Sequence, residues 1–284
     1  MIVVTGATGQ LGRLVIQNLL KTVPAAQIVA AVRSPQKAAD LAALGVQVRE
    51  ADYTKPATLA AAFAGADKLL LVSSSEIGQR AAQHRAAIDA ARAAGVKLVA
   101  YTSILRAPTS TLALAAEHVE TEAMLRASGL PHVLLRNGWY TENYTGSVPA
   151  ALAHGAVIGS AGAGRIAAAA RADYAAAAAA VLLKDGQAGK VYELAGDSAF
   201  TLAALAAEIA RQSGKPVAYQ DLPEAAYKAA LVGFGLPEGF AALLAQSDVA
   251  ASQGALFDDG HQLGALIGRP TTPLADSVAA ALPR

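Results

Sequence analysis

The first twelve residues constrain the fold of this chain more than any other stretch. Residues Ile2 to Thr5 form a short apolar, β-branched run, which is typical of a buried parallel strand. Glycines follow at positions 6, 9 and 12, and apolar residues then recur at helical spacing up to about Lys21. A strand, a glycine turn and a helix in so short a span indicate the opening of a βαβ nucleotide-binding fold.

Each glycine of this turn has its own physical task. Gly6 lets the chain turn sharply, Gly9 lets a pyrophosphate approach the backbone, and Gly12 lets the helix lie close to the strand. The helix N-terminus adds unpaired N–H groups and the positive end of its dipole. We therefore predict a diphosphate cradle, against the alternative of a glycine-rich turn that binds nothing. The predicted cradle consists of Gly6, Thr8, Gly9, Gln10, Leu11 and Gly12.

Strand and helix patterns alternate along residues 1–136. Strands are predicted at residues 2–5, 27–32, 46–49, 68–72, 97–101 and 132–135, with helices at residues 36–44, 56–63, 79–94 and 112–128. Such alternation predicts an α/β fold of the Rossmann type, a doubly wound parallel sheet with right-handed crossovers. Residues 1–136 are therefore expected to form a dinucleotide-binding domain.

The regular alternation ends after residue 136. Residues 137–144 are polar and aromatic, and the glycine-rich residues 155–164 are expected to form a loop or a short hairpin. Helices are predicted at residues 173–184, 201–213, 224–232, 240–244 and 263–267, and residues 191–194 are a candidate late strand. We expect residues 137–284 to form a smaller, mostly helical substrate-binding lobe over the strand ends, with residues 173–196 packing back on the sheet.

Composition excludes several classes of protein. Apolar residues make up 54% and charged residues 16% of the chain, which fits a large core and no disorder. The absence of cysteine excludes disulfides and thiolate chemistry. No apolar run reaches about 18 residues, so no membrane span is expected, and no leader pattern is seen. With a net charge of +1 and no cluster of basic residues, the chain has no positively charged surface that would favour nucleic acid as a partner. A cytoplasmic protein without a metal site is the expectation.

The ends of the next strands predict which cofactor binds. Arg33 stands where an acidic residue would bind the ribose hydroxyls of NAD, and a guanidinium suits the 2′-phosphate of NADP(H). Asp52 is expected near the adenine amino group, and Ser73, Ser74 and Ser75 near the nicotinamide ribose. The alternatives are a solvated surface arginine and an ordinary loop aspartate. The sequence therefore predicts that residues 1–136 bind NADP(H).

Several short stretches together carry a resemblance. They are TGATGQLG at 5–12, VRSP at 32–35, LVSSS at 71–75, AYTS at 100–103, EHVETE at 117–122 and LRNGWY at 135–140. In these stretches, and over nearly its whole length, the chain resembles the NmrA-like, atypical short-chain dehydrogenase/reductase group, most of all its bacterial NAD(P)H:quinone oxidoreductase 2 type. The resemblance implies a two-domain NADPH-dependent reductase that acts on quinones without flavin.

Active short-chain dehydrogenases use a Tyr-x-x-x-Lys motif, and this chain departs from them because none of its tyrosines is followed four residues later by lysine. Ala123 also stands where many NmrA-like members carry a lysine. A quinone demands less of the protein, since hydride transfer makes an aromatic product and positioning supplies most of the acceleration. Asn137 and Tyr140 are the predicted catalytic groups, and Asn137 and Asn143 are also expected at the cofactor. Tyr144 and Tyr101 are weaker candidate donors.

Other interpretations remain open at this point. An NADP(H)-binding redox sensor of the NmrA type, without turnover, is the main alternative. A sugar-nucleotide epimerase or dehydratase is disfavoured, because this chain lacks the Tyr-x-x-x-Lys pair that such enzymes use. The histidine spacing does not fit zinc. His118 with its glutamate neighbours, and His84 with Arg85, are expected on solvated helix faces, and Asp258-Asp259 as a helix cap. A quinone is the expected partner, and a homodimer is possible.

Overall fold

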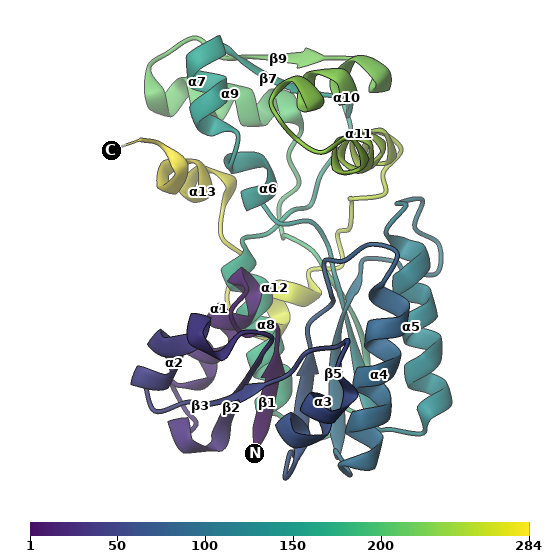
Figure 1. Ribbon diagram of the computed structural model, residues 1–284. Helices are drawn as coiled ribbons and strands as arrows, with labels where there is room; N and C mark the ends of the chain where they lie inside the picture. The colour runs from purple at the N-terminus through teal and green to yellow at the C-terminus, as the bar shows by residue number, and fades with distance from the viewer. Residues whose placement is uncertain (284) are drawn as a thin grey trace. The chain divides into compact units, whose positions relative to one another are not determined.

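The computed structural model describes residues 1–283, which form two compact units (Figure 1). Unit 1 comprises Met1–Pro108, Leu114–Asn137 and Arg171–Leu194. Unit 2 comprises Thr109–Ala113, Gly138–Ala170 and the chain from Ala195 onwards. The chain therefore leaves unit 1 after the sixth strand and returns to it for one further helix and strand.

Unit 1 is built on a parallel sheet of seven strands in the order β3-β2-β1-β4-β5-β6-β8. The strands are β1 Ile2–Thr5, β2 Ile28–Val32, β3 Gln47–Glu50, β4 Lys68–Leu71, β5 Leu98–Ile104, β6 His132–Asn137 and β8 Val191–Leu194. The strand order reverses beside β1, where Val3 pairs with both Val29 and Leu69. This arrangement confirms the predicted doubly wound α/β fold, and the reversal creates the crevice where ligands bind in such sheets.

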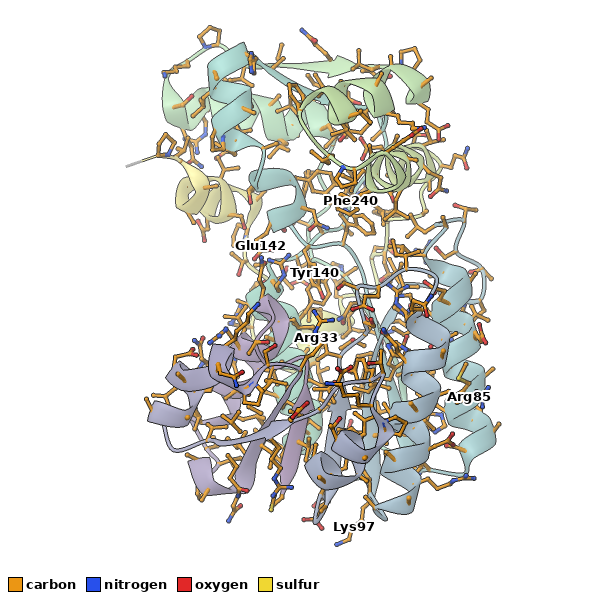
Figure 2. All side chains as sticks on the ribbon, viewed as in Figure 1. Arg33, Arg85, Lys97, Tyr140, Glu142 and Phe240 are labelled. Atoms are coloured by element: carbon orange, nitrogen blue, oxygen red, sulfur yellow. The ribbon has the colours of Figure 1, made fainter. Side chains whose placement is uncertain are left out.

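Helices cover both faces of this sheet. They are α1 Gln10–Leu19, α2 Ala39–Ala43, α3 Pro56–Phe63, α4 Arg80–Ala93, α5 Ala115–Ser128 and α8 Arg171–Leu183, with 3₁₀ turns η1 Ala25–Gln27 and η2 Pro35–Ala38. Helix α3 packs on α4 and α4 on α5, and α1 packs on α8 (Figure 1). The core on the first of these faces includes Val3, Phe63, Leu69 and Ile88. Charged residues just before the strands stay at the surface. An example is the exposed Lys97 (Figure 2), whose Nζ lies 2.7 Å from Asp67 Oδ1.

Strands β5 and β6 run further than the apolar pattern predicts. The expected ends were residues 101 and 135, but backbone pairing continues to Ile104 and Asn137. The Leu105 amide also donates to the Asn137 carbonyl at 2.9 Å. Asn137 is therefore the last residue of β6, and it pairs with Ile104 of β5 on one side and Leu194 of β8 on the other.

Unit 2 is mostly helical, as predicted, with one small sheet. Its helices are α6 Glu142–Thr145, α7 Val148–His154, α9 Leu202–Ser213, α10 Glu224–Gly233, α11 Glu238–Ser252, α12 Gln262–Ile267 and α13 Leu274–Ala281. Strand β7 (Ala156–Gly159) pairs in parallel with β9 (Ala218–Asp221). The expected loop or short hairpin at residues 155–164 was wrong for residues 156–159, because they form a strand whose partner lies far away in the sequence, whereas residues 160–164 form a loop as expected.

Two further expectations for unit 2 were wrong. Helix α11 spans fifteen residues rather than the predicted 240–244, because its alanines and short polar residues dilute the apolar periodicity. The residue that caps α12 is His261, at φ +51°, rather than the Asp258-Asp259 pair. Asp258 instead accepts a hydrogen bond from the Gly260 amide at 2.9 Å.

Candidate functional site

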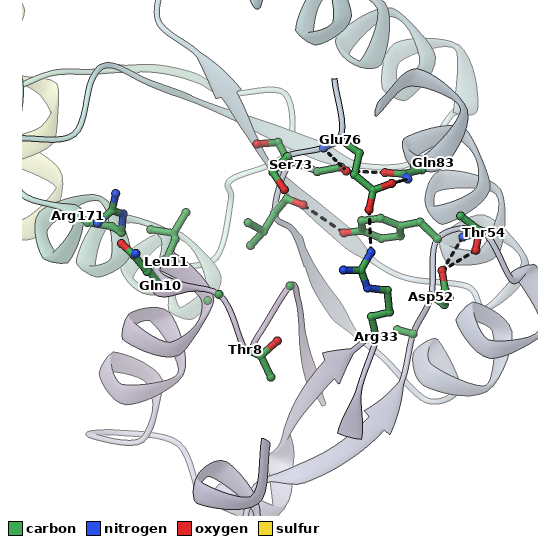
Figure 3. A pocket seen from close by; sticks show the side chains of 18 residues that line it. Thr8, Gln10, Leu11, Arg33, Asp52, Thr54, Ser73, Glu76, Gln83 and Arg171 are labelled. Atoms are coloured by element: carbon green, nitrogen blue, oxygen red, sulfur yellow. Dashed lines mark hydrogen bonds and ion pairs between the residues drawn. The ribbon is translucent and has the colours of Figure 1, made fainter. Parts of the chain in front are cut away.

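A cavity of about 490 Å³ lies within unit 1, at the carboxyl ends of its central strands (Figure 3). The structure brings eleven sequence-predicted residues together around it: Gly6, Thr8, Gly9, Gln10, Leu11, Gly12, Arg33, Asp52, Ser73, Ser74 and Ser75. Val72, from the LVSSS stretch, lies in the same wall, and residues that the sequence did not single out complete it: Ala51, Tyr53, Thr54, Glu76, Gln83 and Arg171. These additions come from loops and helix ends whose place depends on the folded sheet, so no local pattern marked them.

The glycine turn has the close backbone contacts that its sequence predicts. Gly6 adopts φ +57°, and its carbonyl accepts the Gly9 amide at 2.9 Å. A Cβ on Gly12 would lie 2.6 Å from the Gly6 carbonyl oxygen and 2.8 Å from Ala7 Cα, so no larger residue fits there. Gly9 is the N-cap of α1 and no side chain caps this helix, so its first amides stay available for an anion.

Arg13 fixes the turn from one side, a role that the sequence did not indicate. Its guanidinium donates to the Thr8 carbonyl at 3.2 Å and to the Lys37 carbonyl at 2.8 Å, and it pairs with Asp40. These bonds connect the start of α1 to the segment after β2. They thereby tie the diphosphate cradle to the segment that follows Arg33.

Arg33 reaches into the cavity from the end of β2 with a side chain that is 70% exposed. Its Nη1 lies 2.7 Å from Glu76 Oε1, and Gln83 Nε2 donates to the other Glu76 oxygen at 2.7 Å (Figure 3). Asp52 Oδ1 accepts from the Thr54 amide and hydroxyl, at 3.0 and 2.8 Å. The amide bond is the main reason why the pKa of Asp52 lies below its ordinary value.

Buried side chains hold the backbone of the serine segment, residues 73–75. The Ser73 amide donates to Thr102 Oγ1 at 2.8 Å, and the Ser74 amide donates to His84 Nε2 at 2.9 Å. Because Nε2 accepts, the ring proton is on Nδ1, 3.0 Å from Thr121 Oγ1. Burial, with the charge of Arg80, lowers the pKa of His84 to about 3. His84 is therefore a neutral acceptor.

The expectation of solvated histidines on α4 and α5 was wrong. His84 has no exposed surface, whereas the next residue, Arg85, points away from the sheet (Figure 2). His118 is 5% exposed, with its Nδ1 2.7 Å from the fully buried Tyr101 hydroxyl. The two helices pack on each other and on the sheet, which residue type alone does not reveal. Tyr101 is thereby removed from any contact with a ligand.

Glu122 is also buried, at 1% exposure, because cations surround it. It accepts from Ser103 Oγ at 2.7 Å, from Arg136 at 2.7 and 2.8 Å and from Arg126 at 2.8 Å. Arg136 also donates to Glu193 at 2.8 Å, which links α5, β6 and β8. Burial acts to raise the pKa of Glu122, but the bonds from Arg136 and Ser103 outweigh it and the pKa lies below its ordinary value.

The remaining predicted residues lie elsewhere than in this cavity wall. Asn137, in unit 1, is 6% exposed, and its side-chain Oδ1 is buried without a hydrogen-bond partner among residues 1–283. Tyr140 is in unit 2, where its backbone forms an isolated parallel β-bridge with Ala169. Asn143 lines a second cavity, within unit 2, together with Tyr144. An orphaned buried acceptor such as Asn137 Oδ1 is rare in proteins and fits a donor brought by a ligand.

No group of three or more potential ligand side chains in residues 1–283 is arranged to hold a metal ion. Within the same residues, none of the helices has both the length and the apolar character needed to cross a membrane.

The doubly wound sheet and the glycine turn at its switch point define a Rossmann-type dinucleotide-binding protein. The model of the NmrA-like family matches residues 1–263, and the chain belongs to that family. This confirms the family that the sequence motifs indicated.

Relatives of known activity cover nearly the whole chain. Quinone oxidoreductase 2 of Escherichia coli is 64% identical over 98% of this chain and 97% of its own. The NAD(P)H azoreductase of Xenophilus azovorans is 33% identical over 85% and 84%. Among solved structures, the NADPH complex of the E. coli NADPH-dependent quinone oxidoreductase matches with a TM-score of 0.97, at 63% identity, over 99% of each chain. Citrobacter triphenylmethane reductase with NADP(H) matches with a TM-score of 0.96, at 42% identity, over 99% and 100%.

Proposed function

We propose that this chain is an NADPH-dependent quinone reductase that uses no flavin. The observation that carries the proposal is the cavity of unit 1, where the glycine turn and Arg33 meet in one wall. The 64% identity to a quinone oxidoreductase supports the substrate class. The solved NADPH complex of that relative supports the cofactor.

The residues present fit NADP(H) by their own chemistry. The backbone of Gly6–Gly12 and the first amides of α1 hold the diphosphate, because no side chain caps α1 and its first amides are available for an anion. Arg33 binds the 2′-phosphate with a planar pair of donors. Asp52 and the serine segment line the same wall. In the proposal, Asp52 contacts the adenine and the serine segment contacts the nicotinamide ribose.

The bound cofactor supplies a hydride, two electrons and one proton, and the quinone gains a second proton to become a hydroquinone. The protein orients the acceptor and donates hydrogen bonds to the oxygen on which negative charge develops. The Asn137 amide and the Tyr140 hydroxyl are the proposed donors. The second proton comes from Tyr140 or from water, so the missing Tyr-x-x-x-Lys pair does not prevent this reaction.

The direct test is the loss of NADPH absorbance with menadione, with and without the protein. We expect acceleration by protein whose visible spectrum contains no flavin band, and a higher rate with NADPH than with NADH. NADPH that binds but is not consumed with any of several quinones would instead support the redox sensor. The cytoplasmic location and the homodimer remain predictions, and gel filtration tests the latter.

The catalytic assignment has its own test. Asn137→Ala is expected to lower quinone turnover more than NADPH affinity, because the amide acts on the acceptor. Asn18→Ala is a matched control, since Asn18 lies on α1 outside the walls of both cavities. A large loss of NADPH binding in Asn137→Ala with unchanged turnover would contradict the assignment.

A further inference from the structure

The second cavity lies within unit 2 and has a volume of about 570 Å³. Its wall comes from α6, α7, β7, α9, β9, α10 and α11, and most of its side chains are apolar. Within residues 1–283, it shares no residue with the wall of the cavity in unit 1. Small-molecule sites are typically of this size, with apolar walls and a few polar groups that orient the ligand. The cavity is therefore a candidate second site, separate from the one proposed for the cofactor.

One buried acid lies in this largely apolar wall. The Asp248 carboxyl is 6% exposed and accepts one hydrogen bond, from the Ser160 amide at 2.9 Å. Gly159 makes room for this carboxyl, because a Cβ there would lie 2.6 Å from Asp248 Oδ2. Since an ionised carboxyl has about four acceptor positions, most of its hydrogen-bonding capacity is unused.

No cation of the wall offsets the charge of Asp248. Within residues 1–283 the wall contains neither lysine nor arginine. Its histidine, His154, is exposed and stacks on Phe234, with 6.2 Å between the ring centroids. Burial raises the pKa of Asp248 to about 6, and the nearby Asp221 carboxylate adds to the effect. Above about pH 7 the carboxyl is therefore mostly ionised, whereas buried charges in proteins are normally paired.

A hydroxyl and aromatic rings surround the same carboxyl. The Tyr144 hydroxyl is buried and has no partner within residues 1–283. Burial raises the pKa values of Tyr144 and Tyr227, and the charge of Asp248 raises both further, so both hydroxyls lie near this carboxyl. Aromatic rings attract cations through their faces. The wall therefore combines an anion without a cation, an acceptor oxygen without a partner and aromatic surface.

We propose that this cavity binds an apolar molecule with a primary ammonium group, which donates hydrogen bonds to Asp248 and to the Tyr144 hydroxyl while its apolar part covers the rest of the wall. An ammonium has three donors and a positive charge, so it supplies what the carboxylate and the hydroxyl lack. A neutral alcohol supplies a hydrogen bond without the charge and fits less well. The inference does not depend on quinone reduction, since Asp248 and Tyr144 take no part in the proposed reaction.

Helix α10 provides a way into the cavity. It covers one side of the cavity with Tyr227 and Leu231 and packs on α11, yet none of its ten residues is buried. Elements with few buried contacts open locally at a low free-energy cost. A ligand can therefore enter past α10 while the rest of unit 2 stays folded.

The first test compares two probes that differ mainly in charge, 4-phenylbutylamine and 4-phenylbutan-1-ol. In calorimetric titrations of the full chain at pH 8, we expect the amine to bind at least about tenfold more tightly than the alcohol. Asp248→Asn keeps an oxygen for the Ser160 amide, so it should remove this preference while alcohol affinity changes less than about twofold. Asp259→Asn is the matched control, since it removes the same charge at an exposed position and should alter neither affinity.

The second test fills the cavity. Leu231 lines the cavity from α10, whereas the next residue, Val232, is 42% exposed and lies outside the wall. We expect Leu231→Trp to weaken both probes about fivefold or more, because their apolar part loses its burial. Val232→Trp should weaken neither probe. Melting temperatures establish that the variants are folded, and if Leu231→Trp is not, the Asp248→Asn comparison decides alone.

Three results would overturn the inference. Wild-type protein that binds the amine no more tightly than the alcohol, or binds neither, would contradict the ammonium site. An amine that binds Asp248→Asn as tightly as the wild type would show that its charge is not paired with this carboxyl. Affinities that folded Leu231→Trp leaves unchanged would place the probes outside this cavity.

Discussion

Arg33 Nη1 lies 2.7 Å from Glu76 Oε1, so the guanidinium expected to bind a 2′-phosphate is already paired with a carboxylate. Gln83 steadies the same carboxylate through its other oxygen, at 2.7 Å. A phosphate that binds Arg33 must therefore compete with Glu76. Both partners are well exposed, so the pair contributes less than about 1 kcal/mol.

Glu76→Gln should therefore tighten NADPH binding. The substitution removes the competing charge and keeps an oxygen for the Gln83 amide. We expect the Kd for NADPH to fall about two- to fivefold, with a smaller change for NADH, in a fluorescence titration. Glu50→Gln is the control, because Glu50 pairs with Lys55 at 3.7 Å and lies outside the cavity wall. Equal tightening for both cofactors would show that Glu76 acts on something other than the phosphate.

Gly12→Ala should disrupt the cradle. Its Cβ would meet the Gly6 carbonyl oxygen at 2.6 Å and Ala7 Cα at 2.8 Å, and backbone atoms cannot rotate away as a side chain can. We expect at least a tenfold (about 1.4 kcal/mol) loss of NADPH affinity by calorimetry. Gly239→Ala is the control, since nothing lies within 4 Å of a Cβ there and alanine favours a helix. Normal NADPH binding by Gly12→Ala would contradict the cradle.

The features that sequence predicted well are local. The strand of residues 2–5 and the glycine turn depend on neighbours within a few positions, and both lie where the pattern indicated. The pairing of β7 with β9 could not be predicted in this way, because Ala156 pairs with Ala218, far along the chain, and no local pattern connects the two short strands.

Burial of charge was the main source of error. His118 and Glu122 look like a solvated helix face, and only the position of Arg136 on β6 makes the burial of Glu122 tolerable. The candidate site shows the same limit. Arg33 follows directly from its place after a strand, whereas its partner Glu76 comes from a loop that no periodicity positions.

Arg136→Met should destabilise unit 1, because it leaves Glu122 buried without its main cation. We expect a loss of about 3–5 kcal/mol in the free energy of unfolding, measured with urea. Arg126→Met is the control: it bonds to the same carboxylate, but its side chain is 51% exposed, so the loss should stay below about 1 kcal/mol. The double variant Glu122→Gln/Arg136→Met removes the stranded charge and should regain most of the stability.

The same variant should reverse a pH dependence. In the wild type the folded pKa of Glu122 lies below 4.5, so its contribution is present above that pH and is lost as pH falls. In Arg136→Met, burial without Arg136 raises the pKa, and the fold should gain stability as pH falls toward 4.5. Unfolding curves from neutral pH to below pH 4.5 measure the sign for both proteins. A variant that loses stability on acidification as the wild type does would refute the role given to Arg136.

Asp248→Asn should stabilise unit 2 at pH values above the folded pKa of Asp248. Burial raises the folded pKa of Asp248 from 3.8 to about 6, so the wild type loses stability as pH rises through this range and does not regain it above. Asparagine keeps an oxygen for the Ser160 amide and carries no charge. At pH 8 we expect a gain of about 1–3 kcal/mol that shrinks toward zero below pH 4, in urea unfolding.

The control for this gain is Asp259→Asn, since Asp259 is exposed and its removal should change little at either pH. A gain in stability that persists undiminished at pH 4 would mean that the gain does not come from removing the buried charge of Asp248. A gain that disappears as the pH falls below 4 would show that the wild type loses stability by keeping an ionised Asp248 buried near neutral pH.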